Sequence, residues 1–202
     1  MRDDRAMQGA VETEVKIPVA DVAEIAQRLR VAGFKPSVER LLEINTLYDD
    51  INRGLRANGS ILRLRKAGQT SVLTWKARGT TGPHKTREEL ETNVGSVEVL
   101  HRILAELGFS PVFRYEKYRS EFKHPRYQDG VVTVDETPIG SYLELEGPGD
   151  WIDETARQLG FSAKDYILDS YGALYAADCA RRGVQPANMV FASHQEGLSR
   201  QR

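Results

Sequence analysis

The stretch Val11-Glu12-Thr13-Glu14-Val15-Lys16-Ile17 alternates between charged side chains and apolar or small ones. Successive side chains of a β-strand point to opposite faces. This period of two therefore places both glutamates and the lysine on one face and the apolar side chains on the other. A single strand of this kind is typical of a surface strand with a solvated charged face. Recurrence of the pattern along the chain would instead indicate a charged interior.

The alternation recurs in six later segments. Their charged members that share a face are Arg63 and Arg65; Lys76; Lys85, Arg87, Glu89 and Glu91; Lys117, Arg119 and Glu121; Asp135; and Glu144 and Glu146. Short turns rich in Gly and Pro separate many of these segments. They predict hairpins, and hairpins form antiparallel sheets.

The pattern predicts eight strands and four helices. The strands are expected at 10–17, 41–49, 60–66, 70–78, 85–93, 111–124, 131–136 and 141–147, with Pro18 ending the first. The helices are expected at 21–33 with Asp21 as N-cap, and at 97–107, 151–159 and 165–182. Hairpin-joined strands in this number suit a closed barrel. We therefore expect an α+β fold: one closed eight-stranded antiparallel β-barrel with helices packed on its outside.

The expected helices need an apolar sheet surface to pack on, which turns the charged faces toward the barrel interior. Buried charges are costly unless they are paired or neutralised, so a lumen with both signs indicates a ligand that carries charge of its own. The basic side chains favour a polyanion. The carboxylates, which have no His or Cys among them, favour Mg²⁺ or Mn²⁺. A polyanion together with such a cation indicates a polyphosphate.

Composition and net charge argue against several classes of protein. The 202 residues carry a net charge of -1, so no overall field would draw the chain to nucleic acid or to a membrane. The single cysteine, Cys179, rules out an intramolecular disulfide and fits a cytoplasmic location. We see no apolar run of membrane-spanning length and no secretory signal. From Gly183 onward the pattern dissolves, which predicts a flexible tail over 183–202.

Seven motifs in this order resemble the CYTH family, or triphosphate tunnel metalloenzymes. They are Glu12-Thr13-Glu14-Val15-Lys16, Leu62-Arg63-Leu64-Arg65, Thr74-Trp75-Lys76, Arg87-Glu88-Glu89-Leu90-Glu91, Lys117-Tyr118-Arg119, the lone Asp135 and Glu144-Leu145-Glu146. Ser170-Tyr171 is similar to a pair in the last helix of the family. The resemblance implies a single tunnel domain over 10–182.

The resemblance also implies roles for these residues. The implied metal ligands are Glu12, Glu14, Glu144 and Glu146, with help from Asp135 or Glu89. The implied triphosphate-binding residues are Arg63, Arg65, Lys76, Arg87, Lys117 and Arg119. Lys16 would contact the phosphate chain or orient the attacking group, which makes Lys16 and Glu14 the expected catalytic residues.

The motifs leave the reaction open. The first hypothesis is a triphosphatase that releases orthophosphate from inorganic triphosphate, thiamine triphosphate or a nucleoside triphosphate. The second is a class IV adenylate cyclase, in which the ribose 3′-hydroxyl attacks the α-phosphorus of ATP. A non-catalytic polyphosphate-binding module is a third, which two complete pairs of glutamates argue against. An RNA triphosphatase would need a basic outer surface, which the net charge disfavours. A homodimer is plausible, although no particular residue predicts it.

Overall fold

The computed structural model describes residues 10–193. The strands are β1 Ala10–Val19, β2 Lys35–Asp49, β3 Ile61–Ala67, β4 Thr70–Lys76, β5 Thr80–Thr81, β6 Lys85–Asn93, β7 Ser110–His124, β8 Tyr127–Thr137 and β9 Gly140–Glu146. The helices are α1 Val22–Val31, α2 Gly54–Ala57, α3 Val97–Glu106, α4 Gly149–Gln158 and α5 Tyr171–Arg182, with a 3₁₀ turn at Ala163–Asp165.

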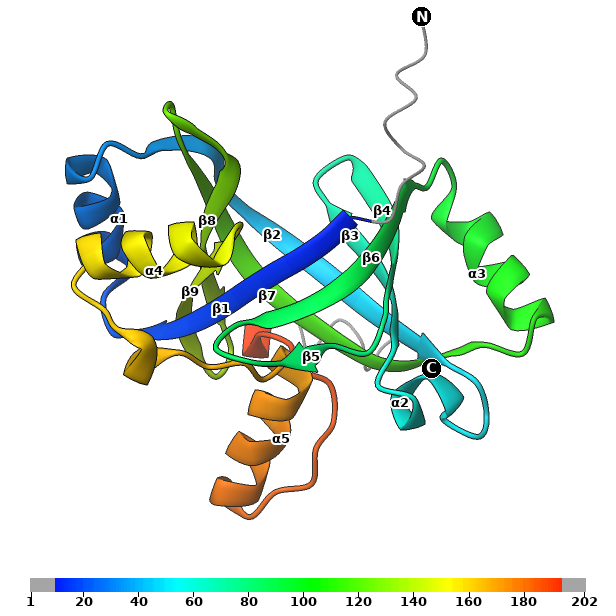
Figure 1. Ribbon diagram of the computed structural model, residues 1–202. Helices are drawn as coiled ribbons and strands as arrows, with labels where there is room; N and C mark the ends of the chain where they lie inside the picture. The colour runs from blue at the N-terminus through cyan, green and yellow to red at the C-terminus, as the bar shows by residue number, and fades with distance from the viewer. Residues whose placement is uncertain (1–9, 194–202) are drawn as a thin grey trace, which may run out of the picture.

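Eight of the strands close into an antiparallel barrel (Figure 1). Their order is β1-β9-β8-β7-β2-β3-β4-β6, and β6 returns to β1 through pairs that run from Ala10↔Glu89 to Glu14↔Lys85. The two-residue β5 only adds to the edge of β6. The predicted closed eight-stranded barrel with helices outside it is therefore confirmed.

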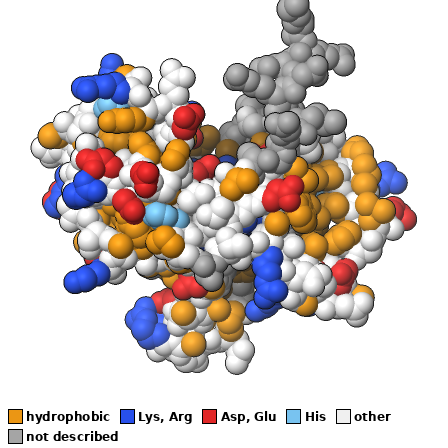
Figure 2. Space-filling model, in the orientation of Figure 1, with side chains coloured by type: hydrophobic (Ala, Val, Ile, Leu, Met, Phe, Trp, Pro, Cys, Tyr) orange, Lys and Arg blue, Asp and Glu red, His pale blue; other side chains and the backbone are white. Residues whose placement is uncertain are grey.

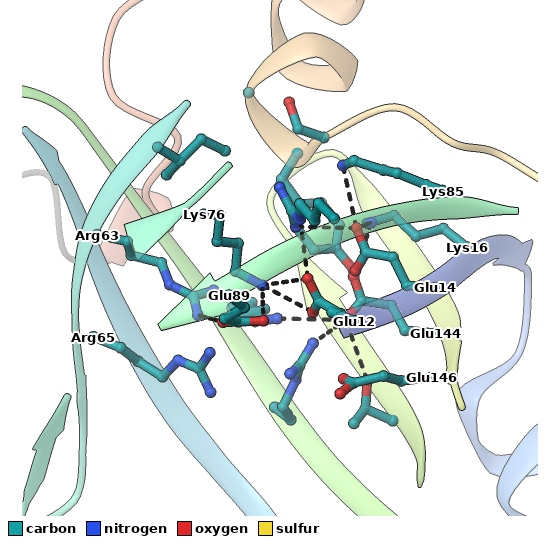
Figure 3. A pocket seen from close by; sticks show the side chains of 18 of the residues that line it. Glu12, Glu14, Lys16, Arg63, Arg65, Lys76, Lys85, Glu89, Glu144 and Glu146 are labelled. Atoms are coloured by element: carbon teal, nitrogen blue, oxygen red, sulfur yellow. Dashed lines mark hydrogen bonds and ion pairs between the residues drawn. The ribbon is translucent and has the colours of Figure 1, made fainter. Parts of the chain in front are cut away.

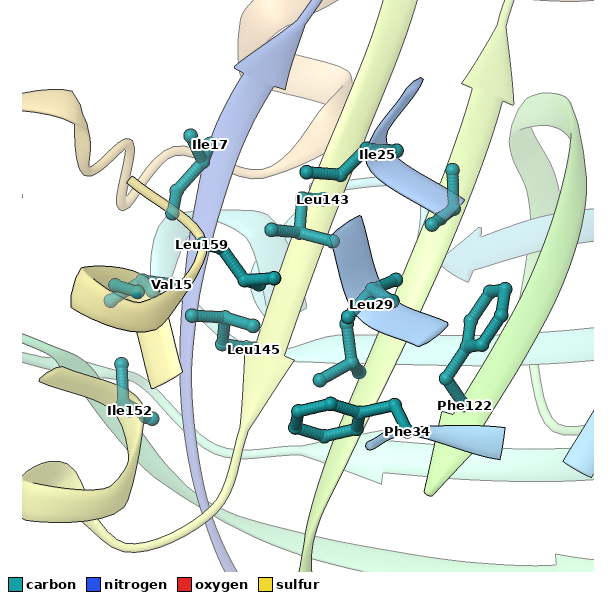
Figure 4. Close-up of a cluster of buried hydrophobic side chains, with 13 residues drawn as sticks. Val15, Ile17, Ile25, Leu29, Phe34, Phe122, Leu143, Leu145, Ile152 and Leu159 are labelled. Carbon is teal, nitrogen blue, oxygen red and sulfur yellow. The ribbon is translucent and has the colours of Figure 1, made fainter. Parts of the chain in front are cut away.

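The largest apolar core lies outside the barrel wall, between the wall and two helices. Val15 and Ile17 of β1 and Leu143 and Leu145 of β9 are at most 1% exposed and pack beneath α1 and α4 (Figure 4). Burying an aliphatic side chain of this size stabilises the fold by roughly 1.5–3 kcal/mol. These residues alternate with the charged ones along each strand. Because the apolar side chains are buried on the outside of the barrel wall, the charged side chains point into the barrel.

The first two strands are longer than predicted. β1 continues through Pro18, which pairs with Tyr142 of β9. The pairing of β1 with β6 stops at Glu14↔Lys85, so Pro18 has a ladder on one side only, and a proline is tolerated at such an edge. β2 begins at Lys35 because this exposed arm pairs with the far end of β7.

The prediction of one helix over 165–182 is wrong in its first part. After the 3₁₀ turn the backbone is extended, and Ile167 exchanges two hydrogen bonds with Lys16 of β1, N to O, at 3.0 and 2.7 Å. The helix starts only after Ser170, whose side chain accepts from the backbone N–H of Ala173. Pairing with the barrel edge thus overrides the helical spacing of the apolar residues.

The prediction of a flexible tail from residue 183 is wrong for the part that the structure describes. Met189 and Val190 are buried, at 1% and 5% exposed. The backbone of Met189 exchanges hydrogen bonds with the strand β7 at Arg114 and Glu116. This segment therefore pairs with β7, and Met189 packs with Tyr115 and Tyr171, two residues that also line the barrel cavity. Residues 194–202 lie outside the described part of the chain.

The outer face drawn in Figure 2 mixes charges of both signs with apolar side chains. The described helix α3 carries exposed Val99 and Ile103, and Leu107 follows at its end. None of the described helices is long and apolar enough to cross a bilayer. No second copy of the chain is present, so the homodimer stays a prediction.

Candidate active site

The barrel encloses a cavity of about 280 Å³. Eight basic and seven acidic side chains line it, so a polyanion entering it would meet nearly balanced charge. All but one of the predicted site residues line this cavity, and the exception is Asp135. The lining members of the predicted set are Glu12, Glu14, Lys16, Arg63, Arg65, Lys76, Arg87, Glu89, Lys117, Arg119, Glu144 and Glu146.

Two neighbouring strands supply the four glutamates of the E-x-E motifs. Register pairs Glu14 with Glu146 and Lys16 with Glu144 across β1 and β9, which sets these side chains beside one another on the lumen face. Lys16 lies between two of them, with its Nζ 3.4 Å from Oε1 of Glu14 and 3.2 Å from Oε1 of Glu144 (Figure 3).

The second half of the lumen wall, β4 and β6, supplies cations to Glu12 and Glu14. Lys76 Nζ lies 2.7 Å from Oε2 of Glu12 and 2.8 Å from Oε2 of Glu89. Arg87 bridges the two β1 glutamates, at 2.9 Å from Oε2 of Glu12 and 3.2 Å from Oε1 of Glu14. These ion pairs are the counter-charges that hold the lumen together without a ligand.

Asp135 is embedded in the barrel wall with none of its surface exposed. It accepts hydrogen bonds from Lys117 Nζ at 2.8 Å, from Arg119 Nε at 2.7 Å and from the Tyr171 hydroxyl at 2.7 Å. Asp135 does not line the cavity itself, although Arg119 and Lys117 connect it to the cavity-lining Glu144. Its contacts indicate that it anchors the two basic residues and the first turn of α5.

Arg63 and Arg65 reach into the cavity from β3 and differ in how firmly they are held (Figure 3). Arg63 Nη2 donates to Oγ1 of Thr74 at 3.2 Å. Arg65 makes no hydrogen bond among the described residues, and its carboxylate neighbours, Glu43 and Glu91, lie 3.7 and 3.9 Å away. Arg65 is thus the less constrained of the two guanidinium groups.

The carboxylates of the lumen have widely different pKa values. Burial alone would raise the pKa of Glu14, but Lys16, Lys85 and Arg87 outweigh it and hold that pKa at about 2. Burial and the neighbouring Glu12, Glu144 and Glu14 raise the pKa of Glu146 to about 7. Burial and Glu12 likewise raise the pKa of Glu89 to about 7, although Lys76 opposes this. The side chain of Glu146 also makes no ion pair or hydrogen bond among the described residues, although its backbone is part of the sheet.

The donor set fits a hard divalent cation. All of its donor atoms are oxygens. A bound cation would relieve the mutual repulsion of the carboxylates that could hold it, which are Glu12, Glu14, Glu144 and Glu146. Glu12, Glu14 and Glu144 are paired with lysine or arginine, and the described residues contain no ready-made cluster of three or more His, Cys, Asp or Glu that could hold a metal ion. Metal ligation by these residues therefore stays a prediction.

Several lumen residues were not among the predicted site residues. Lys85 donates to Glu14 at 3.2 Å, and Glu91 accepts from Thr74 at 2.6 Å. Both were on the predicted charged face of their strand. Glu43 and Asn45 of β2 and Tyr115 of β7 are also buried at the lumen wall. Alternation in Glu43-Ile44-Asn45-Thr46-Leu47 could have found the first two.

Fold and site together define a closed antiparallel barrel whose outside is apolar beneath its helices and whose lumen holds charges of both signs. Residues 10–171 match the CYTH domain. The chain belongs to the CYTH domain family.

Three known proteins show how the chain relates to others. A protein of Methanocaldococcus jannaschii named "Putative adenylate cyclase MJ0240" is 28% identical over 137 residues, 67% of this chain and 76% of that protein. The structure of a "putative adenylate cyclase" from Vibrio parahaemolyticus has a TM-score of 0.73 at 19% identity, covering 83% of this chain and 98% of the other. The Hippeastrum protein HpAC1, a "putative adenylyl cyclase" that "reveals a dominant" triphosphatase activity, has a TM-score of 0.56 at 17% identity, covering 87% and 97%. At these identities the two structures show a shared fold.

Proposed function

We propose that this protein is a divalent-metal-dependent triphosphatase whose active site is the barrel lumen. The observation that carries the proposal is the enclosed cavity in which eight lysines and arginines converge beside two complete E-x-E pairs. The activity described for HpAC1 supports hydrolysis over cyclisation. The proposed substrate is a small triphosphate: inorganic triphosphate, thiamine triphosphate or a nucleoside triphosphate.

The basic residues would bind the phosphate chain and stabilise its charge. Arg63 and Arg65 can each present two guanidinium nitrogens to phosphate oxygens. Lys16 acts as a fixed cation, because Glu144 and Glu14 raise its pKa despite its burial and keep it protonated. Burial of side chains such as Lys16 strengthens these interactions, since solvent screens a buried charge less than an exposed one.

The metal would be held by Glu14, Glu144 and Glu146, with Glu12 beside them. When bound, a divalent cation would neutralise phosphate oxygens and promote ionisation of water. The cation would replace the proton that Glu146 holds near neutral pH. It would thereby also remove the repulsion among these carboxylates.

A class IV adenylate cyclase is the second candidate, favoured by the names of the M. jannaschii and V. parahaemolyticus proteins. A product assay separates the two. Purified protein with Mg²⁺ or Mn²⁺ is given inorganic triphosphate, thiamine triphosphate or ATP. Orthophosphate is the product expected here. Cyclic AMP and pyrophosphate from ATP would establish the cyclase, and binding without any product would establish a polyphosphate-binding module.

Arg65→Ala is expected to raise KM for the triphosphate about 10-fold or more, because a charge-assisted hydrogen bond to phosphate is lost. Steady-state kinetics on the variant measures this. Arg30→Ala, which removes an exposed arginine from α1, is the matched control and should leave KM unchanged. Unchanged KM and kcat in Arg65→Ala would take this residue out of the substrate site.

Stabilisation by metal is expected to grow with pH. Glu89 and Glu146 have folded pKa values of about 7 against an ordinary 4.5, so their contribution to stability is fully present below 4.5 and is lost as pH rises through 7. A divalent cation competes with the proton on Glu146 and restores that loss. The rise in Tm on adding Mn²⁺ should therefore be larger at pH 8 than at pH 6. Equal rises at both pH values would contradict this role of Glu146.

A further inference from the structure

Unpaired polar atoms gather in one part of the lumen wall. Among the described residues, seven buried side-chain nitrogen or oxygen atoms have no hydrogen-bond partner, and five of them belong to four neighbouring residues of β2 and β3. These atoms are Oε2 of Glu43, Nδ2 and Oδ1 of Asn45, Nε of Arg63 and Nε of Arg65. Buried polar groups are normally paired, so a cluster of exceptions calls for an explanation.

Asn45 is the most extreme of the four. Its surface is 0% exposed, and both ends of its carboxamide are unpaired. Leaving such a group unsatisfied is costly, whereas an apolar side chain of similar shape would fill the position without that cost. The position thus sacrifices stability, which is a mark of sites kept for function.

The strand register shows what Asn45 can reach. It lies directly opposite Arg65 on β3 and opposite Tyr115 on β7, and side chains opposite one another in an antiparallel pair share a face. Both of these neighbours line the cavity, while Asn45 itself does not. A ligand in the lumen would therefore meet Arg65 first, with the carboxamide behind it.

Arg65 complements this carboxamide in chemistry. Its Nε–H is a buried donor without an acceptor, and Oδ1 of Asn45 is a buried acceptor without a donor. Within residues 10–193, its charge is balanced by the ion pairs with Glu43 and Glu91 described above. An arginine whose Nε is fixed from behind presents its two Nη atoms in a defined plane, as bidentate binding of phosphate requires.

We propose that Asn45 is a positioning residue for Arg65, pairing its carboxamide with the guanidinium when a phosphate group occupies the lumen. The free protein holds the two groups unpaired, and the substrate draws Arg65 into the geometry in which Asn45 completes its hydrogen bonds. This inference rests on the proposed function, because it takes phosphate as the ligand of Arg65.

The test measures binding of inorganic triphosphate in EDTA by calorimetry, together with Tm, for the full chain. Asn45→Leu should weaken binding roughly 10-fold, since a hydrogen bond to a charged group is lost. It should also raise Tm, because the unpaired carboxamide is gone. With turnover, KM should rise while kcat holds. Thr46→Val, the next residue on the opposite face of the strand, is the control and should not change binding. Asn45→Ala provides the affinity measurement if the leucine variant does not fold.

A double-mutant cycle supplies the second arm. In the Arg65→Ala background, Asn45→Leu should cause no further loss of affinity, because its partner is already absent. If the two substitutions instead lower the affinity by factors that multiply, Asn45 and Arg65 act independently and the proposed pairing is wrong. An Asn45→Leu protein that melts lower than wild type and binds triphosphate equally well would make Asn45 a purely structural group. If the wild-type protein binds no triphosphate either in EDTA or with Mn²⁺, the proposed function fails and this inference with it.

Discussion

Replacing Glu14 by glutamine is expected to lower triphosphate turnover in Mg²⁺ on the order of 1,000-fold, as the loss of a charged metal ligand would cost several kcal/mol of transition-state stabilisation. The carboxamide keeps the size of the side chain but not the charge. Glu14 is 7% exposed and holds a carboxylate with a pKa of about 2, so it is ionised at any working pH and available to a cation.

The fold should survive this substitution. Lys16 keeps Glu144 as a partner, and Arg87 keeps Glu12. The measurements are steady-state turnover, circular dichroism, and calorimetric titration with Mn²⁺, which should show weakened metal binding. Glu88→Gln is the matched control, because Glu88 is exposed on the outer face of β6. Full activity in the Glu14→Gln protein would refute the assignment of the metal site.

Asp135→Asn is expected to destabilise the protein by about 3–5 kcal/mol, the usual cost of removing one partner from a buried ion pair. Two cations, Lys117 and Arg119, donate hydrogen bonds to this carboxylate. Among the other carboxylates of the described chain, Lys117 has two longer contacts, at 3.7 and 3.9 Å, and Arg119 has one, with Glu144. The Tyr171 hydroxyl also loses its charged acceptor. For a chain of this length, such a loss lowers Tm by roughly 6–20 °C.

Thermal unfolding in EDTA measures this effect without any contribution from metal. Asp129→Asn, at an exposed position of the same strand, should melt like the wild type. An Asp135→Asn protein that keeps its Tm but binds Mn²⁺ more weakly would instead make Asp135 a metal ligand, as the family resemblance implied.

The barrel was predictable because one signal repeats in seven of its eight strands, all except β2. In Leu143-Glu144-Leu145-Glu146, for example, the leucines had to be buried under helices, so the glutamates had to face inward. Side chains alternate with a period of two along each strand, so the charged residues of a strand share one face. Once that face is known to point inward in one strand, the same orientation follows for the others. The order of the charged motifs then gave most of the cavity lining.

The elements that were mispredicted depend on contacts between distant parts of the chain. The apolar spacing around Ile167 suits a helix, but hydrogen bonds to Lys16 hold this residue extended. Met189 lies in a segment without periodicity and is nevertheless buried against β7. Local pattern carries no information about either partner.

Within the site, charge pattern could not separate lining residues from wall residues. Asp135 and Glu144 both alternate with apolar neighbours, yet only Glu144 faces the cavity. Asn45 escaped notice because β2 carries a single charge between Leu41 and Leu47. Its importance follows from its unpaired carboxamide, which depends on the packing of three strands.

A crystal structure of the protein soaked with inorganic triphosphate and Mn²⁺ would show whether the lumen is the active site, since anomalous scattering locates the metal. If the lumen is the active site, we expect an anomalous peak beside Glu14, Glu144 and Glu146, and a triphosphate within hydrogen-bonding distance of Arg63 and Arg65. Triphosphate and Mn²⁺ bound only on the outer surface, with the lumen ion pairs unchanged, would contradict this assignment.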